Sequence, residues 1–228
     1  MRNYLTEFIG TFFLVLTAAL TLMNGTPLAP LAIGSALMVM VYMGGHISGA
    51  HYNPAVSLAV LLRGRITVAE FLAYAGSQIA GATVAALVAY AVVGRTIAPS
   101  PADGVTLTGA LVVELLFTFA LALVVLNSAV AAKTQGNSFY GLAIGFTIVV
   151  AAFAGGPLSG GAFNPALAMG MILVDSGVGD GNAAALWIYL VGPLAGGALA
   201  AFVFGIQERE EPAGIHTETS RRPAKQPV

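Results

Sequence analysis

The chain has 228 residues, of which 57% are hydrophobic and only 8% are charged, and its formal net charge is −1. Soluble domains carry about 25% charged residues, so this composition predicts an integral membrane protein. The near-neutral charge argues against a nucleic-acid partner, and the lack of cysteine excludes disulfides and cysteine-ligated cofactors. The apolar runs are long and unbroken, which favours helices over a closed barrel as the structure that satisfies the backbone in lipid.

In chain order, six stretches of about 20 mostly apolar residues are long enough to span a bilayer. They cover residues 4–23, 28–46, 67–93, 107–131, 138–156 and 183–206. Two shorter apolar pieces, 53–62 and 164–174, would each cover roughly 15 Å, about half a bilayer. We therefore expect two re-entrant half-helices that meet near the midplane. The first apolar stretch contains Glu7 and is long, which disfavours a cleavable signal peptide.

The two halves of the chain repeat. Residues 7–14 resemble residues 114–121, and Asn53-Pro54-Ala55 recurs as Asn164-Pro165-Ala166, at an offset of 164 − 53 = 111 residues. Each half holds three spans, an odd number, so the second half must lie upside down relative to the first, as in inverted repeats. We expect one transmembrane domain over residues 1–206, with repeats of about 1–98 and 107–206.

The residues after the last span differ in character. Residues 207–228 are polar, mixed in charge and contain three prolines, so we expect a disordered tail. The positive-inside rule places both termini in the cytoplasm, because only Arg95 then lies outside. The basic residues on the cytoplasmic side are Arg2, Arg63, Arg65, Lys133, Arg209, Arg221, Arg222 and Lys225.

The repeated Asn-Pro pair marks a helix start, since Asn is a good N-cap and Pro suits the first helical position. Each half-helix N-terminus carries about half a positive charge, so two that face each other would repel cations. Asn53 and Asn164 could also offer N–H groups to a passing oxygen. Residues 47–52 and 158–163 are expected to be extended, with carbonyl acceptors along a wet cavity. Two ordinary capped helices are the alternative interpretation.

With these motifs, residues 4–205 resemble the aquaporin family of water and small-solute channels, also called major intrinsic proteins. The resemblance is carried by residues 46–56 and 160–166. It implies an all-α membrane fold with six transmembrane helices and two re-entrant half-helices, a pore in every subunit, and a homotetramer in the cell membrane. The implied function is passive passage of water or small uncharged solutes. No nucleophile–base pair, metal cluster or phosphate loop suggests an enzyme.

Two carboxylates, Glu7 and Glu114, lie inside predicted spans, where ionisable groups are costly and usually functional. Their repeat-related positions suit acceptors for exposed loop N–H groups. In the family, such glutamates typically brace the two loops. A proton relay is the alternative.

Two histidines, His46 and His51, flank the first loop. Too few potential ligands surround them for a metal site, and we expect no cofactor. pH gating through a histidine is a further hypothesis, because histidine titrates near neutral pH. The residues expected to line the pore are His46, Gly49, Ala50, His51, Gly160, Ala162 and Phe163.

The chain departs from the family directly after the second motif, where Leu167 stands in place of the usual arginine. By spacing from the motifs, the other walls of the family's outer constriction fall on Ile33, Ala152 and Gly161. This filter has no charge and no large aromatic ring, so we expect an apolar opening that passes glycerol, urea, ammonia or another small neutral molecule. It could also dewet and stay closed. A secondary transporter and a non-conducting structural protein are the alternative functions.

Two further patterns concern packing. Small residues four apart should let helices approach closely; the pairs are Gly76 and Ala80, Gly141 and Gly145, and Gly192 and Gly196. Aromatic residues near the span ends are expected to anchor the protein at the membrane interface. They are Tyr4, Tyr90, Tyr140, Trp187 and Tyr189.

Overall fold

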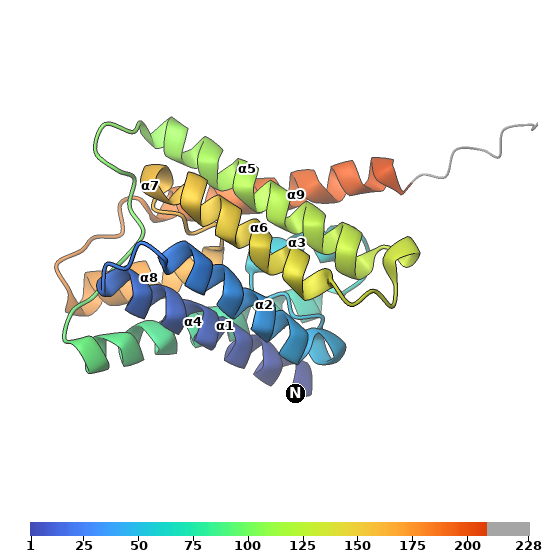
Figure 1. Cartoon of the computed structure of the whole chain (residues 1–228), viewed down its shortest axis with the longest axis horizontal. Helices are drawn as coiled ribbons and strands as arrows, with labels where there is room; N and C mark the ends of the chain where they lie inside the picture. The colour runs from blue at the N-terminus through green and yellow to red at the C-terminus, as the bar shows by residue number, and fades with distance from the viewer. Residues whose placement is uncertain (209–228) are drawn as a thin grey trace, which may run out of the picture.

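The computed structural model describes residues 1–208, and all its regular elements are helices (Figure 1). The expectation for the tail, including Arg209, Arg221, Arg222 and Lys225, falls on 209–228, outside the described residues. The elements are α1 (Arg2–Met23), α2 (Ala29–Ser48), α3 (Pro54–Leu62), α4 (Val68–Val93), α5 (Leu107–Val125), a π-helical end η1 (Leu126–Val130), a 3₁₀ turn η2 (Ala132–Thr134), α6 (Tyr140–Ala154), α7 (Gly156–Ser159), α8 (Pro165–Val178) and α9 (Leu186–Gln207).

The helix starts follow from local polar caps. Thr67 and Glu70 form a reciprocal capping box at the start of α4, and the side chain of Thr106 caps α5. Asn53 and Asn164 cap α3 and α8, each with a proline in the first turn. Both half-helices therefore begin at the positions that the repeated motif predicted.

The packing has the inverted symmetry expected from the sequence. In the first repeat α1 packs against α4 and α2, and in the second α5 packs against α9 and α6. The half-helices are exchanged, since α3 packs mainly on α9 and α8 mainly on α4. Figure 1 shows α3 and α8 toward opposite ends of the long axis. Each repeat therefore supplies a half-helix that packs against a long helix of the other repeat.

Glycines permit the closest helix contacts. A Cβ on Gly34 of α2 would lie 2.6 Å from the carbonyl oxygen of Gly145 on α6, and one on Gly196 of α9 would lie 2.4 Å from that of Leu115 on α5. These contacts agree with the small-residue pairs at 141/145 and 192/196. The expectation for Gly76 is wrong, because a Cβ there would meet nothing within 4 Å.

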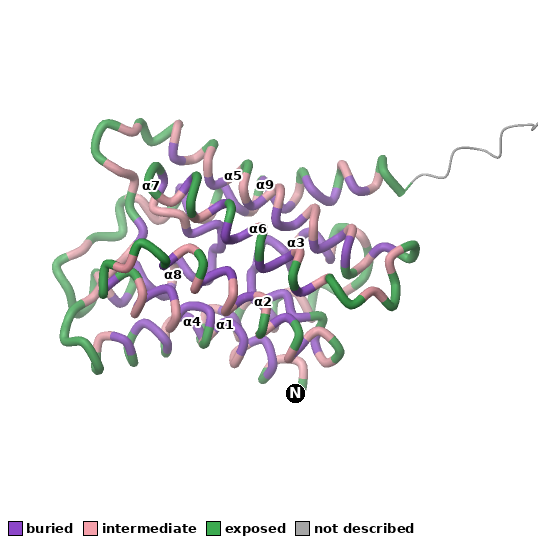
Figure 2. The backbone as a smooth tube through the Cα atoms, viewed as in Figure 1, coloured by how far each residue is buried: buried purple, intermediate pink, exposed green. Residues whose placement is uncertain are grey.

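The burial pattern is that of a helical membrane protein with an outward-facing apolar surface. Figure 2 shows buried residues along the inner faces of the helices and exposed ones outside. Large apolar side chains such as Phe202, Val150 and Leu72 are exposed on the outer faces. Tyr189, expected as an interfacial anchor, is instead fully buried, and its hydroxyl donates to the carbonyl oxygen of Ser159.

Element lengths differ from expectation in three places. Five helices within residues 1–208 are long and apolar enough to cross a membrane, whereas α6 has only 15 residues because the chain breaks at Gly155 and restarts as α7. The second half-helix runs on to Val178, beyond the predicted end at 174. The non-helical stretches before the half-helices are shorter than expected, since α2 reaches Ser48 and α7 reaches Ser159.

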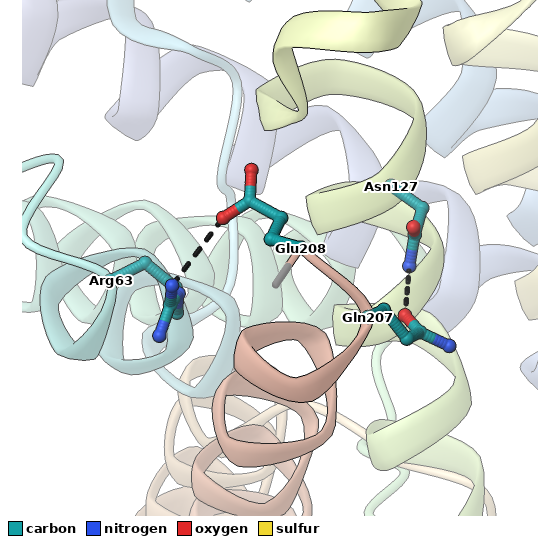
Figure 3. A network of polar contacts seen from close by, with 4 residues as sticks. All are labelled: Arg63, Asn127, Gln207 and Glu208. Atoms are coloured by element: carbon teal, nitrogen blue, oxygen red, sulfur yellow. Dashed lines mark hydrogen bonds and ion pairs between the residues drawn. The ribbon is translucent and has the colours of Figure 1, made fainter. Parts of the chain in front are cut away.

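Polar contacts at one end of the bundle involve the end of the last helix (Figure 3). At the end of α9, Glu208 pairs with Arg63 at 3.3 Å, and Gln207 accepts a hydrogen bond from Asn127 at 3.0 Å. The guanidinium of Arg63 also lies over the ring of Phe204, 5.5 Å from its centre. These contacts tie α9 to the ends of α3 and α5.

Candidate functional site: a cavity through the centre of the bundle

A cavity of about 260 Å³ lies between the helices and is lined by residues of both re-entrant loops, including Asn53 and Asn164. It reaches from residues 97–100 after α4, past the two asparagines, to Leu121 and Val125 of α5. The four residues expected at the outer constriction all line it; they are Ile33, Ala152, Gly161 and Leu167. None of the lining residues is Asp, Glu, Lys or Arg, so the cavity is neutral and mainly apolar.

The two loop asparagines each perform a local and a long-range task. The side-chain oxygens of Asn53 and Asn164 accept hydrogen bonds from Ala55 N and Ala166 N, at 2.9 and 3.0 Å. Their amide nitrogens donate hydrogen bonds to the loop of the opposite repeat. Asn53 Nδ2 donates to the Phe163 carbonyl at 2.8 Å, and Asn164 Nδ2 donates to the Tyr52 carbonyl at 2.9 Å. Because a side-chain amide has two N–H groups, each asparagine keeps one for the cavity.

The residues before the asparagines adopt a backbone conformation that is rare for aromatic side chains. Tyr52 and Phe163 have φ of 50° and 47°. Such left-handed geometry costs on the order of 1–3 kcal/mol per residue and persists only where surrounding contacts enforce it. Here it orients both carbonyls toward the opposite asparagine.

A buried glutamate enforces that geometry in each repeat. Glu7 accepts from His51 N at 3.0 Å, from Tyr52 N at 2.7 Å and from Ser48 Oγ at 2.6 Å. Glu114 is fully buried as well, so its carboxyl oxygens depend on protein groups for their hydrogen bonds.

The contacts of Glu114 repeat those of Glu7. It accepts from Ala162 N at 3.0 Å, from Phe163 N at 2.6 Å and from Ser159 Oγ at 2.8 Å. The two carboxylates thus use both oxygens in loop contacts, and neither lines the cavity.

Sequence reasoning missed the loop-holding role of three residues, Tyr74, Tyr189 and Gln78. The hydroxyls of Tyr74 and Tyr189 donate to the carbonyls of Ser48 and Ser159, one in each repeat. In the first repeat only, Gln78 donates to Glu7 at 2.8 Å and to Ser57 at 3.1 Å. A glutamine inside the apolar stretch 67–93 was the signal that could have identified Gln78.

The predicted pore-lining residues divide into two groups. Ala50, His51, Gly160, Ala162 and Phe163 line the cavity. His46 and Gly49 do not: both are exposed, at the end of α2 and just beyond it, so their assignment to the cavity wall is not supported. Of the motif residues, the asparagines face the cavity, while Pro54, Ala55, Pro165 and Ala166 are buried behind them.

The lining therefore offers few polar groups to a solute. Its polar side chains are Asn53, Asn164, His51 and Ser100, together with Tyr52, whose hydroxyl is engaged with the Met40 carbonyl at 2.9 Å. Within residues 1–208 no group of three or more His, Cys, Asp or Glu could hold a metal. This arrangement suits the passage of a small neutral molecule better than catalysis or ion binding.

Comparison with known proteins agrees with this geometry. A family model described as Major intrinsic protein matches residues 1–204. The chain is 38% identical to Aquaporin NIP1-4 of Oryza sativa subsp. japonica over 90% of its length and 77% of that protein. It is 37% identical to Glycerol uptake facilitator protein-like 6 of Lactiplantibacillus plantarum, over 92% of its length and 100% of that protein.

A solved structure has the same fold. The aquaglyceroporin from Plasmodium falciparum superposes with a TM-score of 0.77 at 24% sequence identity, covering 89% of this chain and 94% of that one. At this identity the likeness concerns the fold alone.

Proposed function

The chain belongs to the major intrinsic protein family and is a multi-pass membrane channel for water or small solutes rather than an enzyme, and we propose that its pore has an atypical apolar constriction that lacks the family's usual arginine. The wall of this constriction is formed by Ile33, Ala152, Gly161 and Leu167. Ala152 and Gly161 leave space, while Ile33 and Leu167 make the lining apolar. We infer that the pore passes small neutral molecules of the size of glycerol or urea as well as water.

The observation that carries this proposal is the single cavity in which all four constriction residues and both loop asparagines face the same space. An arginine side chain at position 167 would narrow this space and offer N–H donors to a solute. The side chain of Leu167 does neither. It is buried and supplies only apolar surface.

Ions are held back by a different part of the pore. The N-termini of α3 and α8 meet at the Asn53 and Asn164 loops, and helix N-termini carry partial positive charge. With the arginine absent, this pair is the main electrostatic barrier to cations. The neutral lining offers no carboxylate that could replace the hydration shell of a cation.

The contacts of the two buried carboxylates argue against an ion-coupled transporter. Such a transporter needs an acid or ion site near the midplane. Glu7 and Glu114 are committed to loop N–H and hydroxyl groups and do not line the cavity. We therefore propose a loop-bracing role for both, and passive rather than coupled transport.

We also propose a homotetramer in the plasma membrane with both termini in the cytoplasm. The homotetramer is proposed from membership of the major intrinsic protein family. Arg63, Lys133 and Glu208 line one hollow at one end of the bundle, while Arg95 donates to the carbonyl of Met23 at the end of α1. This separation of basic residues supports the inside–outside assignment by the positive-inside rule.

The test is stopped-flow light scattering on proteoliposomes that contain the purified protein. We expect osmotic water flux and, in addition, glycerol and urea flux above that of protein-free vesicles. Water flux with exclusion of both glycerol and urea would overturn the proposed wide opening. Saturable flux that depends on an ion gradient would favour a transporter instead.

A further inference from the structure

Four consecutive residues of the connection between α4 and α5 line the cavity. They are Ile97, Ala98, Pro99 and Ser100. We call residues 97–100 the outer strap. The backbone of the strap lies against Gly160, since a Cβ on that glycine would be 2.6 Å from Ser100 N and 2.7 Å from the Ser100 carbonyl oxygen. The strap is therefore next to Gly161, which belongs to the proposed constriction and lines the same cavity.

The strap has no regular backbone structure that would hold it in place. Pro99 and Pro101 have no N–H group, and residues 97–100 lie outside every helix. Among the backbone hydrogen bonds of the described chain, none involves residues 97–100. The position of the strap therefore depends on the contacts made by the residues at its two ends.

Each end of the strap is held by a different element of the second repeat. After the strap, Ala102 N donates to the carbonyl oxygen of Leu158 in α7 at 3.0 Å. Before the strap, the hydroxyl of Thr96 donates to the carboxyl group of Asp175 in the last turn of α8. Because α8 also carries Leu167, this bond ties the strap to the helix that supplies an apolar wall of the proposed constriction.

The hydrogen bond between Thr96 and Asp175 occupies space that two glycines leave open. A Cβ on Gly179 would overlap Thr96 Oγ1, and a Cβ on Gly181 would overlap Asp175 Oδ2. Gly179 has a φ of −109°, and Gly181 is not among the glycines with positive φ, so the backbone conformation does not require glycine at either position. The two glycines instead make room for the Thr96–Asp175 pair, which indicates that the contact is specific.

We propose that Thr96 and Asp175 are positioning residues that hold the outer strap against the cavity, and that the strap thereby limits the size of the solute that reaches the constriction. The inference rests on the proposed function as a channel. Ala152 and Gly161 leave the proposed constriction wide, so the strap supplies an additional limit in front of it. The solutes that it distinguishes are linear polyols: glycerol enters, whereas a five-carbon polyol is held back.

The test compares glycerol with xylitol, a five-carbon polyol, in stopped-flow measurements on proteoliposomes that contain the full-length protein. Thr96→Val removes the hydroxyl and keeps the volume of the side chain. The strap is then still held by Ala102, so we expect the size limit to relax rather than to vanish. The ratio of xylitol to glycerol permeability should rise about threefold, the size of effect of one hydrogen bond. Thr96→Ser keeps the hydroxyl and should keep the wild-type ratio.

Two further pairs of variants separate the contact from charge and from general disturbance. Asp175→Ala should raise the permeability ratio, whereas Asp180→Ala removes the same charge from an exposed side chain and should not. Gly181→Ala should raise the ratio although it removes no polar group. Gly177→Ala is its control, because a Cβ there would meet nothing within 4 Å.

Hydrogen–deuterium exchange, measured by mass spectrometry on the same proteins, reports the anchoring of the strap independently of flux. We expect faster exchange over residues 97–102 in Thr96→Val and Gly181→Ala than in the wild type and Thr96→Ser. Unchanged exchange in Thr96→Val would refute the anchoring. Faster exchange with an unchanged permeability ratio would refute the role in size selection. Absence of all flux from the wild type would refute the proposed channel, while the exchange rates would still decide the anchoring.

Discussion

The side-chain amide of Asn53 donates to the carbonyl oxygen of Phe163 at 2.8 Å, although 110 residues separate the two in sequence. The same bond occurs in mirror order from Asn164 to Tyr52 at 2.9 Å. Each loop thus holds the other, and the N-termini of α3 and α8 are fixed opposite one another. The electrostatic barrier that we propose at the centre of the pore would depend on this reciprocal pair of bonds.

Replacement of one asparagine by aspartate keeps the side-chain cap of the half-helix but removes the hydrogen bond to the opposite loop. Asn53→Asp keeps an oxygen for Ala55 N but places a carboxylate oxygen against the Phe163 carbonyl, where no hydrogen bond can form. We expect a loss of about 1–3 kcal/mol in the free energy of unfolding, together with a cation leak. Thermal unfolding in detergent and potassium flux in proteoliposomes measure the two effects.

The symmetric variant is the control for that experiment. Asn164→Asp should lower stability by a similar amount, because its bond to the Tyr52 carbonyl has nearly the same length. A protein in which only one of the two variants is destabilised would contradict the reciprocal arrangement.

The buried glutamates give a second prediction, about loop geometry. Glu114→Gln replaces one acceptor oxygen by an NH₂ group that faces donors from Ser159, Ala162 and Phe163. We expect at least about 2 kcal/mol lower stability, since hydrogen bonds to the acceptor oxygen are lost and buried donors are left unpaired. Chemical denaturation in detergent measures the change.

Glu7→Gln should be the more damaging of the two, because Glu7 has a fourth donor in Gln78. Thr118→Val, which removes a buried hydroxyl without a partner one turn from Glu114, should be close to neutral. Equal losses in Thr118→Val and Glu114→Gln would mean that packing, and not the carboxylate, is responsible.

Two glycines allow a prediction about the contact between the repeats. In Gly34→Ala the new Cβ would lie 2.3 Å from Val149 Cγ2 and 2.6 Å from the Gly145 carbonyl oxygen. We expect a loss of about 1–3 kcal/mol as α2 and α6 move apart. Gly76→Ala, where the new Cβ meets nothing within 4 Å, should be neutral or stabilising by up to about 1 kcal/mol. Thermal unfolding of the two variants measures this difference in stability. Similar melting temperatures would contradict the close contact between α2 and α6 at Gly34.

How much of this arrangement could be predicted from sequence depended on whether the signal was local. Asn53 and Asn164 mark their helix starts within three residues, so α3 and α8 begin where expected. The inverted repeat followed from counting spans. The end of α8 was missed by four residues, because Asp175 and Ser176 in its last turn read as a loop although the helix runs on to Val178.

The unpredicted parts of the site depend on tertiary contacts. Nothing in the local sequence indicates that Tyr52 and Phe163 take positive φ, since aromatic residues rarely do and the conformation is imposed by Glu7 and Glu114. The burial of Tyr189 was missed for the same reason: a tyrosine near a span end usually anchors at the interface. Its partner, the Ser159 carbonyl, lies at the end of α7, 30 residues away in sequence.

The last prediction tests the proposal that Leu167 takes the place of the arginine usual in the family. Leu167→Arg places a long cationic side chain beside Ala152 and Gly161, where the cavity is lined by small residues. The guanidinium would fill the space that a three-carbon polyol needs, while its N–H groups would still serve water. We expect glycerol flux to fall on the order of tenfold, about 1.4 kcal/mol in barrier height, and water flux to change much less. Stopped-flow measurements on one proteoliposome preparation give both numbers. Leu167→Met, which keeps the volume and the apolar character, should leave both fluxes near the wild-type values. If Leu167→Arg lowered water and glycerol flux equally, position 167 would not be the place where this pore distinguishes the two by size.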